Sequence, residues 1–204
     1  MDEVGYIKYQ VHFKADVDIS ADWVIDLNKY RKHMVVLHYI GESPNDNGEM
    51  IGFGNISQRA TGGFLISATK TGHLETLEAF QYPLVIRCNL GQNWVSFKGK
   101  EDFEPSSEAM THAAIYKVAP DVNAIIHIHD KAMWEKYKDD DSIPSTPYGV
   151  EYGTPEMADA VKEIFANTKV RNLGIFVMNG HLEGVVTFGK NLAEADQIIM
   201  DHMI

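Results

Sequence analysis

Two histidines, two residues apart, form the pattern in this 204-residue chain that most directly suggests chemistry. His127 and His129 lie in the apolar run Asn123-Ala-Ile-Ile-His-Ile-His-Asp130. In a β-strand, residues i and i+2 point to the same face, so the two imidazoles converge while Ile126 and Ile128 pack on the opposite side. Paired imidazoles on one face can bind a divalent metal, with Zn–N bonds of about 2.0–2.1 Å. The alternative is a pair of hydrogen-bonded, partly buried histidines, and a third ligand would decide between the two.

Three other residues are candidates for that third ligand. Glu108 and His112 are four residues apart, which places them on the same face of a helix. Further along, His181 lies in the segment Met178-Asn-Gly-His-Leu-Glu-Gly184, at the tip of an apolar strand. Glycines there allow a tight turn that can bring a side chain toward a site. Taken alone, His181 would be interpreted as a solvated loop histidine.

A second pattern, Glu104-Pro-Ser-Ser-Glu108, begins a predicted helix. The N-terminus of a helix offers unsatisfied N–H groups and the positive end of the dipole, which together favour an anion such as phosphate. Serine is also simply a preferred N-cap residue, so helix capping alone accounts for this composition. The small polar turns Gly54–Ser57 and Thr69–Gly72 could likewise bind an anion through backbone amides.

Strands that could carry these groups are predicted from alternating or short apolar runs. The segment Val4–Val17 alternates apolar and polar residues and predicts an antiparallel strand. Four apolar runs separated by turn residues predict a meander of strands, and three later segments predict buried strands. These runs lie within residues 51–57, 62–68, 83–89 and 93–99, and the later segments within 123–129, 173–178 and 184–188.

Helices are predicted between and after these strands. Trp23–Ile40 has an apolar stripe at helical spacing, and the turn-rich Gly41–Met50 after it predicts a surface loop. Thr154 and Pro155 are typical N-cap and first-turn residues of a further helix. The remaining predicted helices cover residues 105–118, 131–141 and 191–204, and the one that starts at Thr154 runs to about 167. The elements together predict a mixed sheet with helices packed on its faces.

Composition excludes several classes of function. With 18 Lys and Arg against 29 Asp and Glu, the chain carries a net charge of −11, which argues against a nucleic-acid-binding surface. The single cysteine, Cys88, cannot form an intramolecular disulfide, which fits the cytoplasm. The first residues, MDEVGYIKYQ, are too polar for a secretory signal, and no apolar run approaches the roughly 18 residues that span a bilayer. We expect a cytoplasmic protein that binds neither nucleic acid nor membranes.

Taken together, the segments resemble the class II aldolase/adducin family, which includes fuculose-phosphate aldolase and ribulose-phosphate 4-epimerase. The resemblance runs from about Leu27 to Asp201, and although each motif is ordinary, the ordered set is specific. The motifs are Gly54–Ser57, Thr71-Gly72, Pro105–Glu108 followed by His112 and Tyr116, Pro120–His129, Tyr152–Pro155, and Asn179–His181 followed by Gly189–Ala195.

The resemblance implies an α/β (mixed α+β) fold with a central, mostly antiparallel sheet and helices on both faces. It implies one domain over residues 1–204, in which residues 1–22 add an N-terminal strand extension. It also implies a homo-oligomer, specifically a homotetramer with active sites at subunit boundaries.

The resemblance also assigns roles to single residues. His127, His129 and His181 would bind Zn²⁺ or another divalent metal. Glu108 would bind the metal when substrate is absent and would move protons during turnover. His112 matches a helix position that is not a ligand. The residues that would surround the substrate phosphate are Asn55, Thr71, Gly72, Ser106 and Ser107.

The implied activity is that of a zinc-dependent aldehyde-lyase of carbohydrate metabolism. It would cleave a C–C bond of a small sugar phosphate or hydroxyketone through a metal-stabilised enediolate, because Lewis acidity stabilises the developing charge. Glu108 favours the aldolase branch, since the epimerase branch carries Asp at that position. The alternatives are a sugar-phosphate 4-epimerase or dehydratase that uses the same site, and a non-catalytic, adducin-like assembly domain.

The chain departs from the family pattern at a few positions. Leu182 and Glu183 separate His181 from the next glycine, where the motif usually reads His-Gly. Lys70 stands where proline is common, and the stretch between His129 and the Tyr-Gly-Thr-Pro motif is shorter than in the sugar-phosphate aldolases. No tyrosine is assigned the protonating role, for which Tyr137, Tyr148 and Tyr152 are available.

Overall fold

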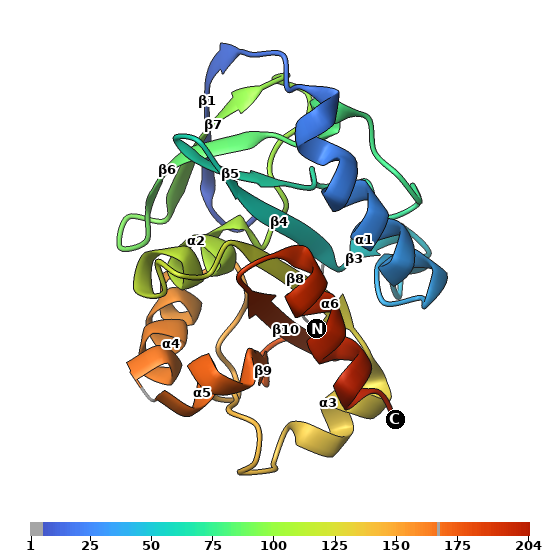
Figure 1. Ribbon diagram of the computed structural model, residues 1–204, viewed down its shortest axis with the longest axis vertical. Coiled ribbons are helices and arrows are strands. Elements are labelled where there is room, and N and C mark those ends of the chain that lie inside the picture. Colours follow the sequence, from blue (N-terminus) through green and yellow to red (C-terminus); the bar gives the residue numbers. More distant parts are fainter. Residues whose placement is uncertain (1–5, 167) are drawn as a thin grey trace.

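An eight-stranded sheet runs along the length of the molecule, as the ribbon in Figure 1 shows. The computed structural model describes residues 6–166 and 168–204, and within them the strand order is β1-β7-β6-β5-β4-β8-β10-β9. The edge strand β1 pairs with β7 in parallel, and the other described neighbours in the sheet are antiparallel. The predicted mixed fold with a mostly antiparallel central sheet is therefore confirmed.

Element bounds are as follows. The sheet contains β1 (Gln10–Asp16), β4 (Asn55–Ala60), β5 (Gly63–Ile66), β6 (Leu84–Asn89), β7 (Trp94–Gly99), β8 (Ala124–His129), β9 (Ile175–Val177) and β10 (Gly184–Gly189). A separate hairpin is made of β2 (Gly41–Pro44) and β3 (Met50–Phe53). The helices are η1 (Ala21–Val24), α1 (Ile25–Val36), η2 (Ala79–Gln81), α2 (Ala109–Val118), α3 (Lys131–Tyr137), α4 (Pro155–Ala166), α5 (Thr168–Leu173) and α6 (Leu192–His202).

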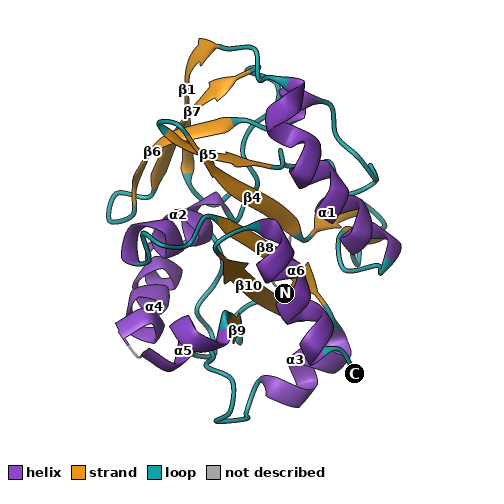
Figure 2. Ribbon diagram, in the orientation of Figure 1, coloured by secondary structure: helices purple, strands orange, loops and turns teal. Residues whose placement is uncertain are grey.

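Helices cover both faces of the sheet (Figure 2). One core packs the sheet against α2 and α4, and the other packs it against α1, α3 and α6. The strand β8 shows the alternation that builds both cores: Ile126 and Ile128 join the α1–α6 core, whereas Ile125 joins the α2–α4 core. His127, at the same parity as Ile125, therefore faces the start of α2.

The interpretation of Gly41–Met50 as a surface loop is wrong for half of its length. Residues 41–44 pair with residues 50–53 as the β2–β3 hairpin, and residues 45–49 between them form an irregular turn. In that turn the Asn45 side-chain oxygen accepts hydrogen bonds from the backbone amides of Asn47 and Glu49. The residues of β2, Gly-Glu-Ser-Pro, are half-buried or exposed and mostly polar, so their composition looks like that of a loop.

Several predicted boundaries shift. The helix predicted over Trp23–Ile40 begins as the turn η1 and ends at Val36, where the backbone turns into the left-handed region at His38 (φ 61°). The strand predicted over 173–178 is shortened to β9, because residues 168–173 form α5. The strand predicted from Val4 begins at Gln10, and its predicted antiparallel pairing is wrong, because β1 pairs with β7 in parallel. Val4 itself and residue 167 lie outside the described residues.

Two further expectations concern the whole chain. Among the described residues, no helix combines the length and the apolar character that crossing a membrane requires. The strand β1 lies at the edge of the same sheet as the other strands. The division of the chain into one domain with an N-terminal extension over residues 1–22 stays a prediction.

Candidate metal centre

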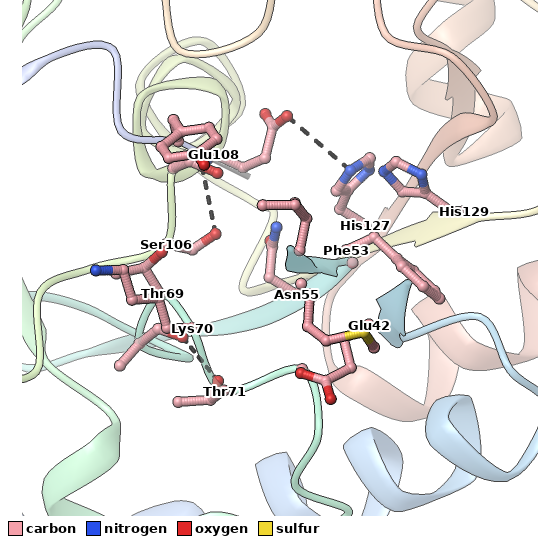
Figure 3. Close-up of a pocket in the computed structure, with 18 of the residues that line it drawn as sticks. Glu42, Phe53, Asn55, Thr69, Lys70, Thr71, Ser106, Glu108, His127 and His129 are labelled. Atoms are coloured by element: carbon pink, nitrogen blue, oxygen red, sulfur yellow. Dashed lines mark hydrogen bonds and ion pairs between the residues drawn. The ribbon is translucent and has the colours of Figure 1, made fainter. Parts of the chain in front are cut away.

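Three imidazoles meet at the end of β8. His127 and His129 come from that strand, and His181 comes from the loop that joins β9 to β10. The Nε2 atoms of His129 and His181 are 3.0 Å apart, and one ring nitrogen from each of the three residues lies within 4.8 Å of the others. Figure 3 shows His127 and His129 side by side at the edge of a cavity. The structure thus brings together the two strand histidines and the distant His181.

The orientation of His127 is fixed by its other ring nitrogen. Its Nδ1 donates a hydrogen bond to the carbonyl oxygen of Val185 on the neighbouring strand β10, at 3.2 Å. Such a bond selects the tautomer whose Nε2 carries a lone pair. That Nε2 atom is buried and has no hydrogen-bond partner among the described residues. The Nε2 atom of His127 is therefore free of hydrogen bonds within the described chain and oriented to act as a metal ligand.

Burial keeps the three imidazoles neutral. Desolvation lowers the pKa of His127 to about 4, against a small raising effect of the Val185 carbonyl. It also lowers the pKa values of His129 and His181 well below the ordinary value, and the charges of the neighbouring histidines lower them further. Neutral imidazole is the form that binds a metal, so the cluster needs no deprotonation at neutral pH.

Glu108 lies beside the histidines, immediately before the first residue of α2. Its Oε1 atom is 3.4 Å from Nε2 of His181 and 4.0 Å from Nε2 of His127. Its Oε2 atom accepts a 2.6 Å hydrogen bond from the Thr111 hydroxyl. Burial raises the pKa of Glu108 to about 7, although Thr111 and the charge of Lys8 both lower it. A carboxyl group with a pKa near neutrality can both accept and donate a proton.

The donor set fits a divalent metal ion. Glu108 Oε1 and His127 Nε2 are both buried and without hydrogen-bond partners in the described chain, and they lie 4.0 Å apart. Buried polar atoms are rarely left unsatisfied, so two such atoms beside two more imidazoles indicate a missing common partner. A cation bound by three nitrogens and one carboxylate oxygen would satisfy both.

A cavity of about 460 Å³ extends from the histidines, and all the residues predicted to surround a phosphate lie along it. They come from separate places in the chain: Asn55 on β4, Thr71 and Gly72 after β5, and Ser106 and Ser107 before α2. Figure 3 shows Asn55, Thr71 and Ser106 around this cavity, together with Glu108. The structure thus brings these predicted residues together, and their role toward a substrate stays a prediction.

The serine corner, Ser106 and Ser107, is built by backbone hydrogen bonds. Ser106 donates its amide to the Ser67 carbonyl at 3.1 Å, and its hydroxyl accepts from the Glu108 amide at 3.3 Å. Asn55 lies opposite His127 in the pairing of β4 with β8, and its buried side-chain oxygen has no partner among the described residues. The corner is thus tied to the residue that follows β5, and Asn55 lies next to the metal centre through the pairing of β4 with β8.

The loop that carries Thr71 and Gly72 is held by Arg31, a residue that was not among the candidate site residues predicted from the sequence. Arg31 on α1 is buried, and its guanidinium donates to the carbonyl oxygens of Thr71 (2.6 Å) and Leu74 (2.9 Å). A Cβ atom on Gly72 would lie 2.0 Å from the Gly41 carbonyl oxygen, so the loop packs directly on the β2–β3 hairpin. The feature of the sequence that could have indicated Arg31 is its charge at a position within the apolar stripe of a predicted helix.

Tyr152 is a second residue of the site to which no role was assigned from the sequence. Its buried ring lies 4.6 Å from the ring of His181, centroid to centroid, and so packs against one of the three imidazoles. His112 lies behind the site, where its Nδ1 atom is 2.7 Å from the Ser57 hydroxyl, which is in turn 2.8 Å from the Tyr116 hydroxyl. The Tyr-Gly-Thr-Pro motif contains Tyr152, but only the fold shows that Tyr152 contacts His181.

Comparison with known proteins places these features in a family. The model described as the Class II Aldolase and Adducin N-terminal domain matches residues 45–200. The chain belongs to this family. The match includes every residue predicted to bind the metal or the phosphate.

Relatives in the family include enzymes that act on sugar phosphates. The chain is 29% identical over 149 residues to a 5-methylthioribulose-1-phosphate/5-deoxyribulose-1-phosphate aldolase of Escherichia coli O45:K1 (strain S88 / ExPEC). That alignment covers 64% of this chain and 65% of the relative, so the chain spans slightly less than two thirds of its length.

Solved structures of the family share the fold. An L-fuculose 1-phosphate aldolase superposes with a TM-score of 0.65 at 19% identity, over 89% of this chain and 82% of that one. The l-fuculose-1-phosphate aldolase of Thermus thermophilus gives a TM-score of 0.62 at 19% identity, over 89% of each chain. At this level of identity the likeness concerns the fold.

Proposed function

We propose that this family member is a zinc-dependent aldolase-type lyase that cleaves a C–C bond of a small sugar phosphate through an enediolate. The observation that carries the proposal is the convergence of three neutral imidazoles on Oε1 of Glu108, beside a cavity that ends in the serine corner. The relative named as an aldolase of two ribulose 1-phosphates supports a ketose 1-phosphate as substrate.

In this proposal His127, His129 and His181 hold the zinc ion. Bound there, zinc would supply Lewis acidity toward the negative charge that develops on the substrate oxygens. Because the three ligands are neutral, they leave the full charge of the ion available. Val185 keeps the lone pair of His127 directed at the ion.

Glu108 is the proposed proton carrier. Thr111 holds its Oε2 atom, which leaves Oε1 directed at the histidines, and Oε1 is the atom at which the proton is taken up and returned. A positioned general base or acid typically contributes about 10²- to 10⁴-fold to the rate. The side chain is almost fully buried, so bulk water does not compete for this proton.

The serine corner is proposed to bind the phosphate group. Hydroxyl groups and backbone amides at the start of a helix suit an anion, and the acidic chain supplies few cations for this purpose. Among the described residues that line the cavity, Lys70 is the one with a permanent positive charge, and Glu42 and Glu49 add negative charge. This arrangement favours a substrate with one anionic end.

Two measurements test the proposed function. Metal analysis of the purified protein is expected to give about one zinc per chain, and incubation with a panel of ketose 1-phosphates is expected to release an aldehyde from one of them. The His127→Ala variant should lose both. A protein without stoichiometric metal would contradict the proposal. An isomeric or dehydrated product without release of an aldehyde would replace it with an epimerase or a dehydratase.

Two further expectations stay predictions beside this proposal. The homotetramer is one, and analytical ultracentrifugation of the purified chain tests it. The cytoplasmic location is the other, and it rests on the single cysteine, Cys88.

A further inference from the structure

A short N-terminal segment, residues 6–9, lies against the candidate site although it precedes the region that the family model matches. Tyr6 is one of the residues that line the cavity. Its backbone amide donates to the Tyr152 hydroxyl at 3.2 Å, and Tyr152 packs on His181. The segment is therefore in indirect contact with the metal centre.

Tyr9 holds the serine corner. Its hydroxyl lies 2.7 Å from the carbonyl oxygen of Ser106 and 3.1 Å from that of Pro105, and it donates to this pair. The phenol is almost fully buried, so water cannot replace the bond. Loss of this hydroxyl would remove the donor of the Pro105 carbonyl and leave the Ser106 carbonyl with the Ala109 amide alone, at 2.9 Å, so the backbone that presents Ser106 would be free to shift.

Lys8 fixes the middle of the segment. Its ammonium group pairs with Glu151 at 2.8 Å and lies 4.3 Å from the centre of the Tyr152 ring. Its charge is near enough to lower the pKa values of Glu108 and His181. The backbone carbonyl of Lys8 also accepts a hydrogen bond from the Asn93 side chain at 2.8 Å. The segment is thus anchored both to the loop before α4 and to the turn before β7.

Tyr6 connects the segment to the β2–β3 hairpin. Its hydroxyl donates to a carboxylate oxygen of Glu49 at 3.0 Å, and both residues line the cavity. A phenol next to a carboxylate offers hydrogen-bond acceptors to a hydroxyl group and repels a second anion. This part of the wall therefore suits the uncharged, hydroxylated part of a sugar phosphate.

We propose that the N-terminal segment completes the substrate site, with Tyr6 as a contact for the hydroxylated part of the substrate and Tyr9 as the positioning residue of the serine corner. The nature of the substrate rests on the proposed function, but the location of the two contacts does not. The inference adds a wall to the site that the matched region, residues 45–200, does not contain.

Two probes that cannot be cleaved test the inference without turnover. Inorganic phosphate reports on the anion corner, and D-ribitol 5-phosphate, which has no carbonyl group, reports on the whole cavity. Binding is measured by calorimetry on the full chain, with and without zinc, so that contacts to the ion are separated from contacts to the protein. The zinc content and thermal unfolding of each variant are measured alongside.

Tyr9→Phe is expected to weaken the binding of both probes about tenfold, the effect of one lost hydrogen bond that positions an anion site. The matched control is Tyr82→Phe, which also removes a buried phenol that donates a hydrogen bond, to Asn28 at 3.0 Å, and does not line the cavity. This control should bind both probes as the wild type does. Equal behaviour of the two variants would overturn the role of Tyr9.

Tyr6→Phe and Tyr6→Ala are expected to weaken D-ribitol 5-phosphate about five- to tenfold and to leave inorganic phosphate unchanged. Tyr148→Phe is the matched control, because its exposed phenol also donates to a carboxylate, Asp139 at 2.7 Å, away from the cavity. Unchanged binding of the sugar alcohol phosphate by Tyr6→Ala would overturn the contact.

The outcomes separate this inference from the proposed function. If the wild type cleaves no ketose phosphate but Tyr9→Phe and Tyr6→Ala bind as expected, the proposed function fails and the inference stands. If cleavage is found but both variants bind like their controls, the inference alone fails. A wild type that binds neither probe overturns the inference.

Discussion

At the scale of single residues, the candidate site depends on groups whose protonation is set by burial. The three imidazoles are neutral because desolvation lowers their pKa values, to about 4 for His127. The same desolvation acts in the opposite direction on a carboxyl group and raises the pKa of Glu108 to about 7. One buried environment therefore sets the protonation of both the proposed metal ligands and the proposed proton carrier.

The first prediction concerns the pH dependence of metal binding. Three histidines of ordinary pKa would lose about 1000-fold in zinc affinity between pH 7.5 and 5.5, because three protons would compete with the ion. Here the histidine pKa values are lowered, so only Glu108 takes up a proton in this range. We expect a loss of no more than about 30-fold, the effect of a single competing proton.

A competitive chelator titration at several pH values measures this dependence. Glu108→Gln cannot take up that proton, so its zinc affinity should be nearly constant over the same range. A slope of three protons in the wild type would show that the imidazoles titrate normally and that the pKa of His127 is not lowered.

The second prediction concerns the role of Glu108 in turnover. Glu108→Gln keeps the shape of the side chain and one acceptor oxygen for Thr111 but cannot carry a proton. We expect kcat to fall by about 10²- to 10⁴-fold, while the zinc content stays near that of the wild type because three histidines remain. Glu183→Gln serves as the control, since it removes the same charge two residues from His181 at a position that does not line the cavity. Equal kcat values in the two variants would remove Glu108 from the mechanism.

A large part of the candidate site could be predicted from residue types and their spacing. The i, i+2 spacing of His127 and His129 predicts their common face, since it depends only on strand geometry. His181 is 52 residues away from its 3.0 Å neighbour His129, so no local pattern could join the two. The family resemblance supplied that link, and Tyr6 and Arg31 were missed because their contacts depend on the packing of distant segments.

At the scale of elements, the loop between β9 and β10 decides where His181 lies. The loop is closed by backbone bonds from His181 to Met178 and from Gly184 to His181, at 3.1 and 2.9 Å. Gly180 lies so close to the segment around Val150 that a Cβ atom there would be 1.9 Å from the Val150 carbonyl oxygen. The third imidazole is thus placed by a backbone contact that only glycine permits.

The third prediction follows from this contact. Gly180→Ala is expected to cost about 1–3 kcal/mol of unfolding free energy, because the backbone must move to relieve the clash, and to weaken zinc binding because His181 moves with the loop. Gly48→Ala is the control: its φ of +81° strains an alanine, but nothing lies within 4 Å of the added carbon. It should cost about 1–2 kcal/mol and leave zinc affinity unchanged. Urea unfolding and a zinc titration measure both effects, and an unaltered zinc affinity in Gly180→Ala would contradict the proposed role of the loop.

Helices and strands with a clear apolar or capping pattern were predicted well. Strands that are defined only by their pairing with another strand were not. β8 and α4 follow closely from an apolar run and from the Thr154-Pro155 start. The strand β2 was interpreted as part of a loop because its residues are polar, and its pairing with β3 rather than its composition defines it. Local propensity is a weak guide where one face of a strand is not buried.

At the scale of the whole molecule, the site is formed where segments that are distant in the chain come together. The parallel pairing of β1 with β7 joins Gln10 to Trp94, and it carries the N-terminal segment toward the cavity. Strand order of this kind depends on contacts between distant residues, which the sequence pattern of one strand does not contain. The layers could be predicted from the alternation of apolar residues, whereas the neighbours of each strand came from the structure.

A cation bound at this site should stabilise the entire fold, which gives the last prediction. An ion that binds the folded chain alone adds about 2.7 kcal/mol at a free concentration of 100 times its Kd. For a chain of this size, each kcal/mol raises Tm by about 2–4 °C, so saturation with zinc should raise Tm by roughly 5–10 °C relative to protein treated with a chelator. His181→Ala should lose most of this increase, since it removes the ligand that ties the β9–β10 loop to β8. His202→Ala, at the end of α6 and outside the cluster, should keep it. Differential scanning calorimetry measures the six Tm values, with and without zinc for the wild type and both variants, and an equal increase in both variants would place the zinc elsewhere in the protein.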